Sequence, residues 1–348
     1  MNQMKKSSTF RRLMSAKATP LLIILIVLML ITMVLSSNVL HGAPIKNMFT
    51  TGFMTPINWM TNFYGLVIQI LMCAGLSCAL ISGNMDLSIA AQATLGAMIF
   101  AMLCYSTALP LLVIVVITIA LSVAFGMVNT ILVNVFKFPS FIATIGMSSV
   151  YGGLTYLITG GNNYAVNRPG VLWLGAKKFF GILPLTFIIA IVILLGFEFM
   201  LRRTVFGRYI YMCGGNPVAA RLAGLNPNRM RMWMFLSNSI LSVMGGVFWT
   251  AQAQTASPSS ITSSAPNMTA TAAAILGGVS FFGGTGTLFG PLVALVLINV
   301  LENMLDILGM GPYWIVFFQG VLLLLALFID YVSLKKKEAD MVKAALSK

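Results

Sequence analysis

The sequence contains very little charge for a chain of its length. Lys, Arg, Asp and Glu make up 8% of its 348 residues, whereas 59% are hydrophobic and the mean hydropathy is +0.95. A soluble domain has about 25% charged residues, because its surface must be hydrated. This shortage excludes a soluble enzyme, a secreted disulfide scaffold and a disordered chain, and it predicts an integral membrane protein in contact with lipid.

The residues that usually carry metal or nucleophilic chemistry are also scarce. There is one histidine, His41, and there are four cysteines, which show neither CxxC nor other metal-site spacing. The chain has no HExxH motif and no nucleophile elbow. We therefore expect no metal site, no catalytic residues and no enzymatic activity.

The long uncharged stretches indicate helices rather than strands. Leu87–Phe136 and Met232–Leu301 contain no charged residue, and each is too long for a single span of roughly 20 residues. Strands of a membrane barrel would alternate apolar and polar residues, and Leu111–Val116 does not. We predict an all-α integral membrane protein of about ten transmembrane helices, forming a single transmembrane domain over residues 1–348.

Apolar length, interrupted by Gly, Pro and polar clusters, places these spans. Their predicted extents are Pro20–Ser36, Ile57–Ser82, Leu87–Cys104, Leu109–Val135, Pro139–Thr159, Leu183–Leu201, Met230–Ala253, Thr269–Phe282, Thr287–Leu305 and Pro312–Tyr331. The first could be a signal peptide, but its uncharged run is longer than a signal h-region and no A-x-A site follows promptly. We expect a retained first helix.

The basic residues predict the orientation. The net charge is +14, and most of the 21 Lys and Arg fall in residues 1–19, 202–231 and 332–348. Cytoplasmic loops carry the excess of Lys and Arg, so we predict a basic cytoplasmic N-terminus, a cytoplasmic loop and a basic cytoplasmic tail. The basic residues flank the predicted spans and do not form a basic patch that could bind the phosphates of a nucleic acid. We therefore expect no nucleic-acid partner.

A short helix is predicted inside the loop 202–231. Asn216 can cap its first amides, Pro217 suits the first helical position, and Gly224 can adopt the left-handed conformation that ends it. Seven residues from Pro217 to Ala223 extend roughly 10 Å, which is too short to span a membrane. The segment is either a short rigid helix that receives mechanical force from a separate protein, or an ordinary basic loop whose charges determine the membrane topology.

Three motifs, Ser82–Met98, Gly207–Arg231 and Ala274–Asn303, resemble in order and spacing the ribose-type permeases of ATP-binding-cassette (ABC) importers. The resemblance implies a type II ABC importer permease-like fold, paired with a second permease chain, identical or different. It also implies a cytoplasmic ABC ATPase and an extracytoplasmic substrate-binding protein as partners. The residues that it assigns to coupling with the ATPase are Asn216, Pro217, Ala219, Ala220, Arg221, Leu222, Ala223 and Gly224.

Asp86 lies between two predicted spans, where an ionisable group costs about 2.5–3.5 kcal/mol and is a functional candidate. A carboxylate there can cap a helix N-terminus, and we favour this role over the alternative of direct substrate contact. Asn84 replaces the glycine that is usual in the family motif, so the turn is altered. The predicted turn and cap residues are Gly83, Asn84, Asp86, Ser88, Gly283 and Gly284.

Glu302 and Asp306 lie four residues apart near the outer end of the ninth span, hence on one helix face. They could form a proton or cation relay, an outer gate that meets the binding protein, or a solvated helix end. Glu198 lies one turn from Arg202, which predicts a local ion pair at the inner interface.

The glycine-rich segment Gly283–Gly286 differs from a P-loop, because no Lys or Arg occurs between Met232 and Leu301. We therefore expect no cofactor in this chain, with ATP bound by the partner. A neutral polyol would need amides and hydroxyls along its path, although such groups also join helices, at about 0.6 kcal/mol per polar pair. The pathway candidates are Gln69, Gln92, Asn129, Asn238 and Asn299.

Together these features predict the permease subunit of an ATP-driven, binding-protein-dependent importer of a monosaccharide, such as a pentose or hexose, in a bacterial inner membrane. Relatives of this fold carry nucleosides, furanosyl signals or amino acids, so the same importer class with such a substrate is an alternative. An ion-coupled secondary transporter that uses Asp86, Glu302 or Asp306 is another.

Overall fold

The computed structural model describes residues 18–37, 44, 46–47, 51–311, 313–321, 323–325, 327–328, 331–332 and 335. The long helices are α2 (Ala18–Ser36), α4 (Pro56–Ile81), α5 (Ile89–Ser106), α6 (Leu111–Asn134), α7 (Ser140–Thr159), α9 (Leu185–Arg203), α12 (Pro227–Ala253) and α14 (Phe289–Ile307). The short ones are α8 (Pro169–Ala176), α10 (Val205–Gly215), α11 (Pro217–Leu222) and α13 (Pro266–Leu276), with 3₁₀ turns η2 (Gly52–Met54) and η3 (Thr262–Ser264).

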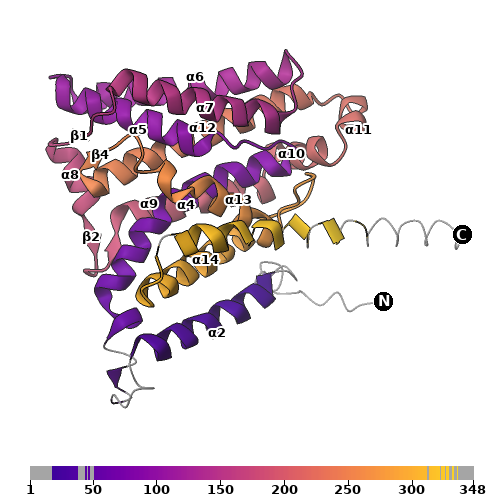
Figure 1. Cartoon of the computed structure of the whole chain (residues 1–348). Helices are drawn as coiled ribbons and strands as arrows, with labels where there is room; N and C mark the ends of the chain where they lie inside the picture. Colours follow the sequence, from indigo (N-terminus) through magenta and orange to yellow (C-terminus); the bar gives the residue numbers. More distant parts are fainter. Residues whose placement is uncertain are drawn as a thin grey trace, which may run out of the picture.

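The long helices lie side by side with their axes roughly aligned (Figure 1). At one end lie α10 and α11; at the other lie α8 and two small antiparallel pairs, β1 (Tyr164–Ala165) with β4 (Thr255–Ala256) and β2 (Lys178–Phe179) with β3 (Leu183–Pro184). In the part of the chain that the structure describes, seven helices are long and apolar enough to cross a membrane: α4, α5, α6, α7, α9, α12 and α14. The chain is therefore a multi-pass helical protein, as predicted.

Two predicted elements differ from the structure. In place of the eighth predicted span, Thr269–Phe282, the structure has the 11-residue helix α13, which begins earlier, at Pro266, and ends at Leu276, because the chain turns at Gly277–Gly278 and Gly278 adopts a φ of 94°. The loop 202–231 is mostly helical rather than irregular: Thr204 caps α10 by accepting a hydrogen bond of 3.1 Å from the Gly207 amide. Most of the tail 332–348, most of the segment 1–19, His41 and part of the tenth predicted span lie outside the described residues.

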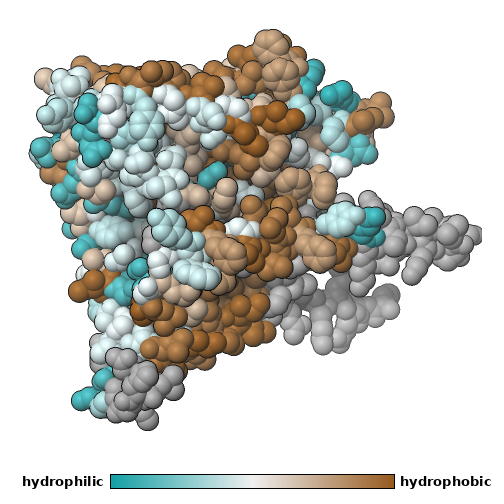
Figure 2. Space-filling model, in the orientation of Figure 1, coloured by the Kyte–Doolittle hydropathy of each residue, from teal (hydrophilic) through white to brown (hydrophobic). Residues whose placement is uncertain are grey.

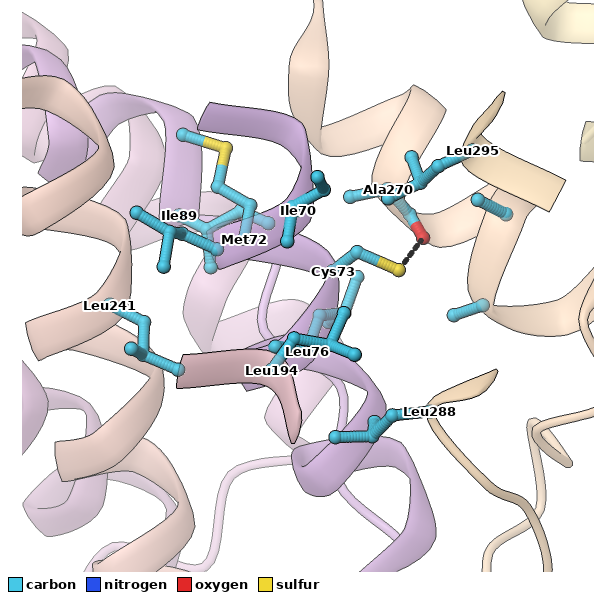
Figure 3. Close-up of a cluster of buried hydrophobic side chains, with 14 of the residues drawn as sticks. Ile70, Met72, Cys73, Leu76, Ile89, Leu194, Leu241, Ala270, Leu288 and Leu295 are labelled. Atoms are coloured by element: carbon cyan, nitrogen blue, oxygen red, sulfur yellow. Dashed lines mark hydrogen bonds between the residues drawn. The ribbon is translucent and has the colours of Figure 1, made fainter. Parts of the chain in front are cut away.

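Helix α4 is the centre of the bundle. It packs against α9, α12, α13 and α14, and Figure 3 shows Cys73 of α4 among the side chains of its neighbours, with its Sγ 3.6 Å from the Ala270 oxygen. Small residues allow this packing: a Cβ on Gly75 would lie 2.4 Å from Asn238 Oδ1 of α12. Close packing of this kind replaces the hydrophobic effect as the main attraction between helices in lipid.

The outer helices α6, α7 and α9 expose large apolar side chains, for example Leu112, Leu157 and Val192. Figure 2 shows hydrophobic surface over much of the bundle and more hydrophilic side chains toward the end that carries α8 and the short strands. An apolar belt with polar ends fits a lipid environment. All four cysteines of the sequence are within the described part of the chain, and there each is buried and free.

Candidate functional site

Helix α11 has the two ends that the sequence predicts. Asn216 Oδ1 accepts hydrogen bonds from the amides of Val218 (3.1 Å) and Ala219 (2.9 Å), and Pro217 occupies the first turn. Ala223 is the C-cap residue, and Gly224 follows with a φ of 80°. The predicted short helix is confirmed, one residue shorter than expected.

The helix projects from one end of the bundle (Figure 1). Leu222 is 86% exposed and Val218 is 67% exposed, whereas Ala220 is buried against the rest of the chain. Val218 and Leu222 are four residues apart, so they share one face of the helix. Two large apolar side chains on a protruding helix, with the exposed Arg221 beside them, form a small surface suited to a protein partner.

The backbone immediately before α11 meets two turns from distant parts of the sequence. A Cβ on Gly214 would lie 1.8 Å from the Ile81 oxygen, and one on Gly283 would lie 2.9 Å from the Gly83 Cα. The Gly284 amide donates a hydrogen bond of 2.8 Å to the same Ile81 oxygen. We call Gly83, Gly214, Gly283 and Gly284 the glycine junction.

The junction contains three of the predicted turn residues, Gly83, Gly283 and Gly284, which have φ values of 78°, 89° and 74°. Positive φ favours glycine, because a Cβ would collide with the backbone. Sequence reasoning did not include Gly214 among the site residues, although the Gly214-Gly215 dipeptide was a signal of close backbone approach. The three sequence motifs therefore meet at this one point.

Two side chains hold the glycine-rich loop beside the junction. The Tyr211 hydroxyl of α10 donates to the Gly286 oxygen at 2.7 Å, and burial, together with nearby Glu198, raises the pKa of this phenol to about 12. Glu198 forms the predicted ion pair with Arg202. It also accepts a 2.6 Å hydrogen bond from the Leu288 amide and so caps α14, which the sequence did not reveal.

Asp86 is fully buried in a polar network between helices. Its Oδ1 accepts from the amide (2.9 Å) and hydroxyl (2.5 Å) of Ser88, the residue before α5. Its Oδ2 accepts from Asn238 Nδ2 of α12 (3.1 Å) and Asn129 Nδ2 of α6 (3.4 Å). Gln92 Nε2 donates to Ser88 Oγ at 2.7 Å. Asp86 thus binds a backbone amide at the start of α5, and three pathway candidates lie in its network.

The remaining predicted residues lie apart from this network. Asn84 Nδ2 donates to the Ser82 oxygen at 3.0 Å and so stabilises its own turn. Glu302 accepts a 2.8 Å hydrogen bond from Gln319, with Gln69 beside the same carboxylate, whereas Asp306 is exposed.

Asn299, the last of the pathway candidates, is buried beside Gly65, where an added Cβ would lie 3.7 Å from its Nδ2. The structure therefore does not bring all five pathway candidates together. Among the described residues, no group of three His, Cys, Asp or Glu side chains could hold a metal ion.

Comparison with known proteins gives the same assignment as the motifs. The family described as "Branched-chain amino acid transport system / permease component" matches residues 58–327. The chain belongs to this family. It is 30% identical over 313 residues to the ribose import permease protein RbsC of Escherichia coli K12, covering 89% of this chain and 92% of that protein.

Two further relatives show the range of the family. RbsC of Bacillus subtilis is 30% identical over 85% of this chain and 90% of its own length. The autoinducer 2 import system permease protein LsrC of Yersinia enterocolitica is 28% identical over 85% of this chain and 80% of its own length. No solved structure matches the chain.

Family membership and the apolar helices identify the chain as a multi-pass ABC permease subunit of a bacterial inner membrane. The relatives are transport subunits rather than enzymes. The resemblance inferred from the three motifs is therefore confirmed.

Proposed function

We propose that this chain forms the membrane pathway of an ATP-driven, binding-protein-dependent importer of a monosaccharide. The two ribose permeases, each 30% identical over most of the chain, support a pentose or a similar sugar. The autoinducer 2 permease supports a furanosyl signal as the second candidate substrate, and the family description supports an amino acid as a third.

The glycine junction is the proposed mechanical link between α11 and the rest of the bundle. A separate ATPase binds α11. Helix α10 then transmits the movement of α11 to the turn between α4 and α5 and to the loop between α13 and α14. Backbone contact at Gly214 supports this route, because a Cβ there would lie 1.8 Å from the Ile81 oxygen at the end of α4. Residues 216–224 are thus the coupling segment, and ATP binds to the partner.

The arrangement of the helices also supports a cytoplasmic location for both termini. The N-terminal end of α2 lies at the same end of the bundle as α11, on the right in Figure 1. Residues 1–19, 202–231 and 332–348 carry most of the basic residues. Ten crossings require α2, the apolar helix at Tyr313–Leu325 and the short helix α13 in addition to the seven helices that are long and apolar enough to cross a membrane. The whole chain then forms one transmembrane domain.

The partners of the complex follow from the family. They are a cytoplasmic ABC ATPase, an extracytoplasmic binding protein and a second permease chain, identical or different, in contact with lipid. The ion-coupled alternative is less favoured, because Asp86 and Glu302 are engaged by Asn, Ser and Gln side chains of the bundle.

Reconstitution in proteoliposomes tests this function. The chain is combined with a cytoplasmic ABC ATPase and an extracytoplasmic sugar-binding protein, and uptake of labelled D-ribose, D-xylose and D-glucose is measured. We expect uptake that needs ATP and survives collapse of the ion gradients. Uptake by the chain alone, driven by a proton or sodium gradient, would overturn the proposal.

A further inference from the structure

A cavity of about 510 Å³ opens at the end of the bundle opposite α11. Its walls are the beginning of α4, the end of α8 with the start of β2, and the last turn of α12 (Figure 1). Its polar and aromatic lining consists of Thr61, Tyr64, Lys178, Trp249, Gln252 and Gln254.

The walls of this cavity are held by specific contacts. A Cβ on Gly175 would lie 1.9 Å from the Ala251 oxygen, so only glycine allows α8 to lie this close to α12. The Tyr64 hydroxyl donates a 3.1 Å hydrogen bond to the Gly175 oxygen and thereby joins α4 to α8. Gln252 Nε2 donates to Thr186 Oγ1 at 2.8 Å, which joins α12 to α9. The cavity therefore has a defined shape and fixed side chains.

The lining offers hydrogen-bond donors and acceptors together. Gln252 and Gln254 carry amides and Thr61 a hydroxyl, and all three groups can both donate and accept. Lys178 is the single charged residue among those described that line the cavity, and its Nζ lies 6.0 Å from the centroid of the Tyr64 ring.

A site for an anion would present mainly donors, whereas the hydroxyls of a polyol match a mixed set. The rings of Tyr64 and Trp249 add apolar faces for the C–H surface of a sugar ring. Apolar walls with a few fixed polar groups are the usual composition of a small-molecule site.

We propose that this cavity is a binding site for a neutral polyol of monosaccharide size on the outer side of each permease chain. Substrate released by the binding protein occupies it before the bundle opens toward the cytoplasm. The assignment of a sugar as the ligand, and of this end of the bundle as the outer side, rests on the proposed function. The cavity itself and the hydrogen-bonding groups that line it do not depend on that function.

Thiol labelling tests the site directly, because the four native cysteines are buried. Thr61→Cys places a thiol of similar size at an exposed position in the cavity, and Ser106→Cys places one at an exposed position of the same end outside it. Membrane-impermeant maleimide is applied to the full importer in vesicles with D-ribose, D-xylose, D-glucose or sodium gluconate at millimolar concentration. We expect at least one neutral sugar to slow the labelling of Thr61→Cys severalfold, with no effect of gluconate and no change at Ser106→Cys.

A second pair of substitutions tests the aromatic wall in the Thr61→Cys background. Trp249→Leu should abolish the protection by sugar, whereas Trp173→Leu, at an exposed tryptophan of α8 outside the cavity, should retain it. Lack of protection by every neutral sugar, or equal protection by gluconate, would overturn the inference. Equal slowing at Ser106→Cys, or protection that survives Trp249→Leu, would overturn it as well.

Uptake measured on the same vesicles separates this inference from the proposed function. Sugar uptake without protection of Thr61→Cys overturns the cavity as a sugar site and leaves the importer function intact. Protection without uptake of any of the sugars supports the cavity and contradicts the proposed transport substrate.

Discussion

The hydroxyl of Tyr211 donates a hydrogen bond of 2.7 Å to the backbone oxygen of Gly286. This bond joins α10, the helix directly before α11, to the loop that leads into α14. Glu198 reinforces the connection from α9 by accepting a hydrogen bond from the Leu288 amide. The glycine-rich loop is therefore held by Tyr211, from the helix next to the proposed coupling helix, and the backbone that follows the loop is held by Glu198 of α9.

Loss of the Tyr211 hydroxyl should weaken the transmission of force. Tyr211→Phe removes one buried hydrogen bond, which costs about 0.5–1.5 kcal/mol of stability, and it leaves the surface of α11 unchanged. We expect normal binding of the ATPase but less sugar transported per ATP hydrolysed. Tyr209→Phe, at a tyrosine of the same helix, is the matched control. An equal ratio of sugar transported to ATP hydrolysed in the two variants would contradict the role of Tyr211.

The close backbone approach at the glycine junction predicts that alanine is tolerated at Gly215 but not at Gly214. Gly214→Ala would place its Cβ 1.8 Å from the Ile81 oxygen, so we expect severe loss of folded protein in size-exclusion chromatography of the detergent-solubilised chain. Gly215→Ala would place its Cβ 3.6 Å from the Gly284 Cα, an ordinary contact, and should be tolerated. Similar yields for the two variants would show that the helices do not approach this closely.

The buried carboxylate of Asp86 should matter for assembly more than for sugar preference. Asp86→Ala removes the acceptor of the Asn238 side-chain amide and of the Ser88 backbone amide and hydroxyl, whereas Asn129 keeps its 2.9 Å hydrogen bond to Ser88 Oγ. Each unsatisfied buried group costs about 1–3 kcal/mol. We expect a lower unfolding temperature and lower yield, with an unchanged order of sugar preference in the protein that remains. Asp306→Ala, at an exposed carboxylate, should have little effect. A normal yield with changed preference would instead support direct contact of Asp86 with substrate.

Charge reversal on α11 should abolish coupling to the ATPase without affecting insertion of the chain into the membrane. Arg221→Glu combined with Leu222→Glu removes an exposed cation and an apolar side chain from the protruding helix without disturbing its Asn216 cap. We expect normal membrane insertion and loss of ATPase binding in co-purification. Arg208→Glu, at an exposed position of α10, should retain binding. Unchanged transport in the double variant would exclude the coupling role.

The sequence predicted the elements whose signals are local. The ends of α11 follow from Asn216, Pro217 and Gly224, and the Glu198–Arg202 pair follows from their spacing along one helix. Apolar length located the seven helices that can cross a membrane, because each is a mostly apolar stretch of about the length that one crossing requires.

What the sequence did not predict depends on residues that are far apart in the chain. No local pattern reveals that Gly214 lies against Ile81, that Glu198 caps α14, or that Asn129 and Asn238 meet at Asp86. Helix α10 was missed because its glycines and basic residues resemble a loop, while its stability comes from a Thr204 cap and a buried face. The cavity between α4, α8 and α12 likewise exists only once these three helices are packed together.

The contact between Gly214 and the end of α4 joins two main chains with no side chain in between. A contact between two main chains has no side-chain rotamers that could adjust. A small displacement of α11 is therefore transmitted to the bundle instead of being taken up by side-chain movement. In the proposed coupling role of α11, this contact also leaves the exposed side chains of α11 free to differ between relatives, since a different ATPase could be bound while the linkage behind α11 stays the same.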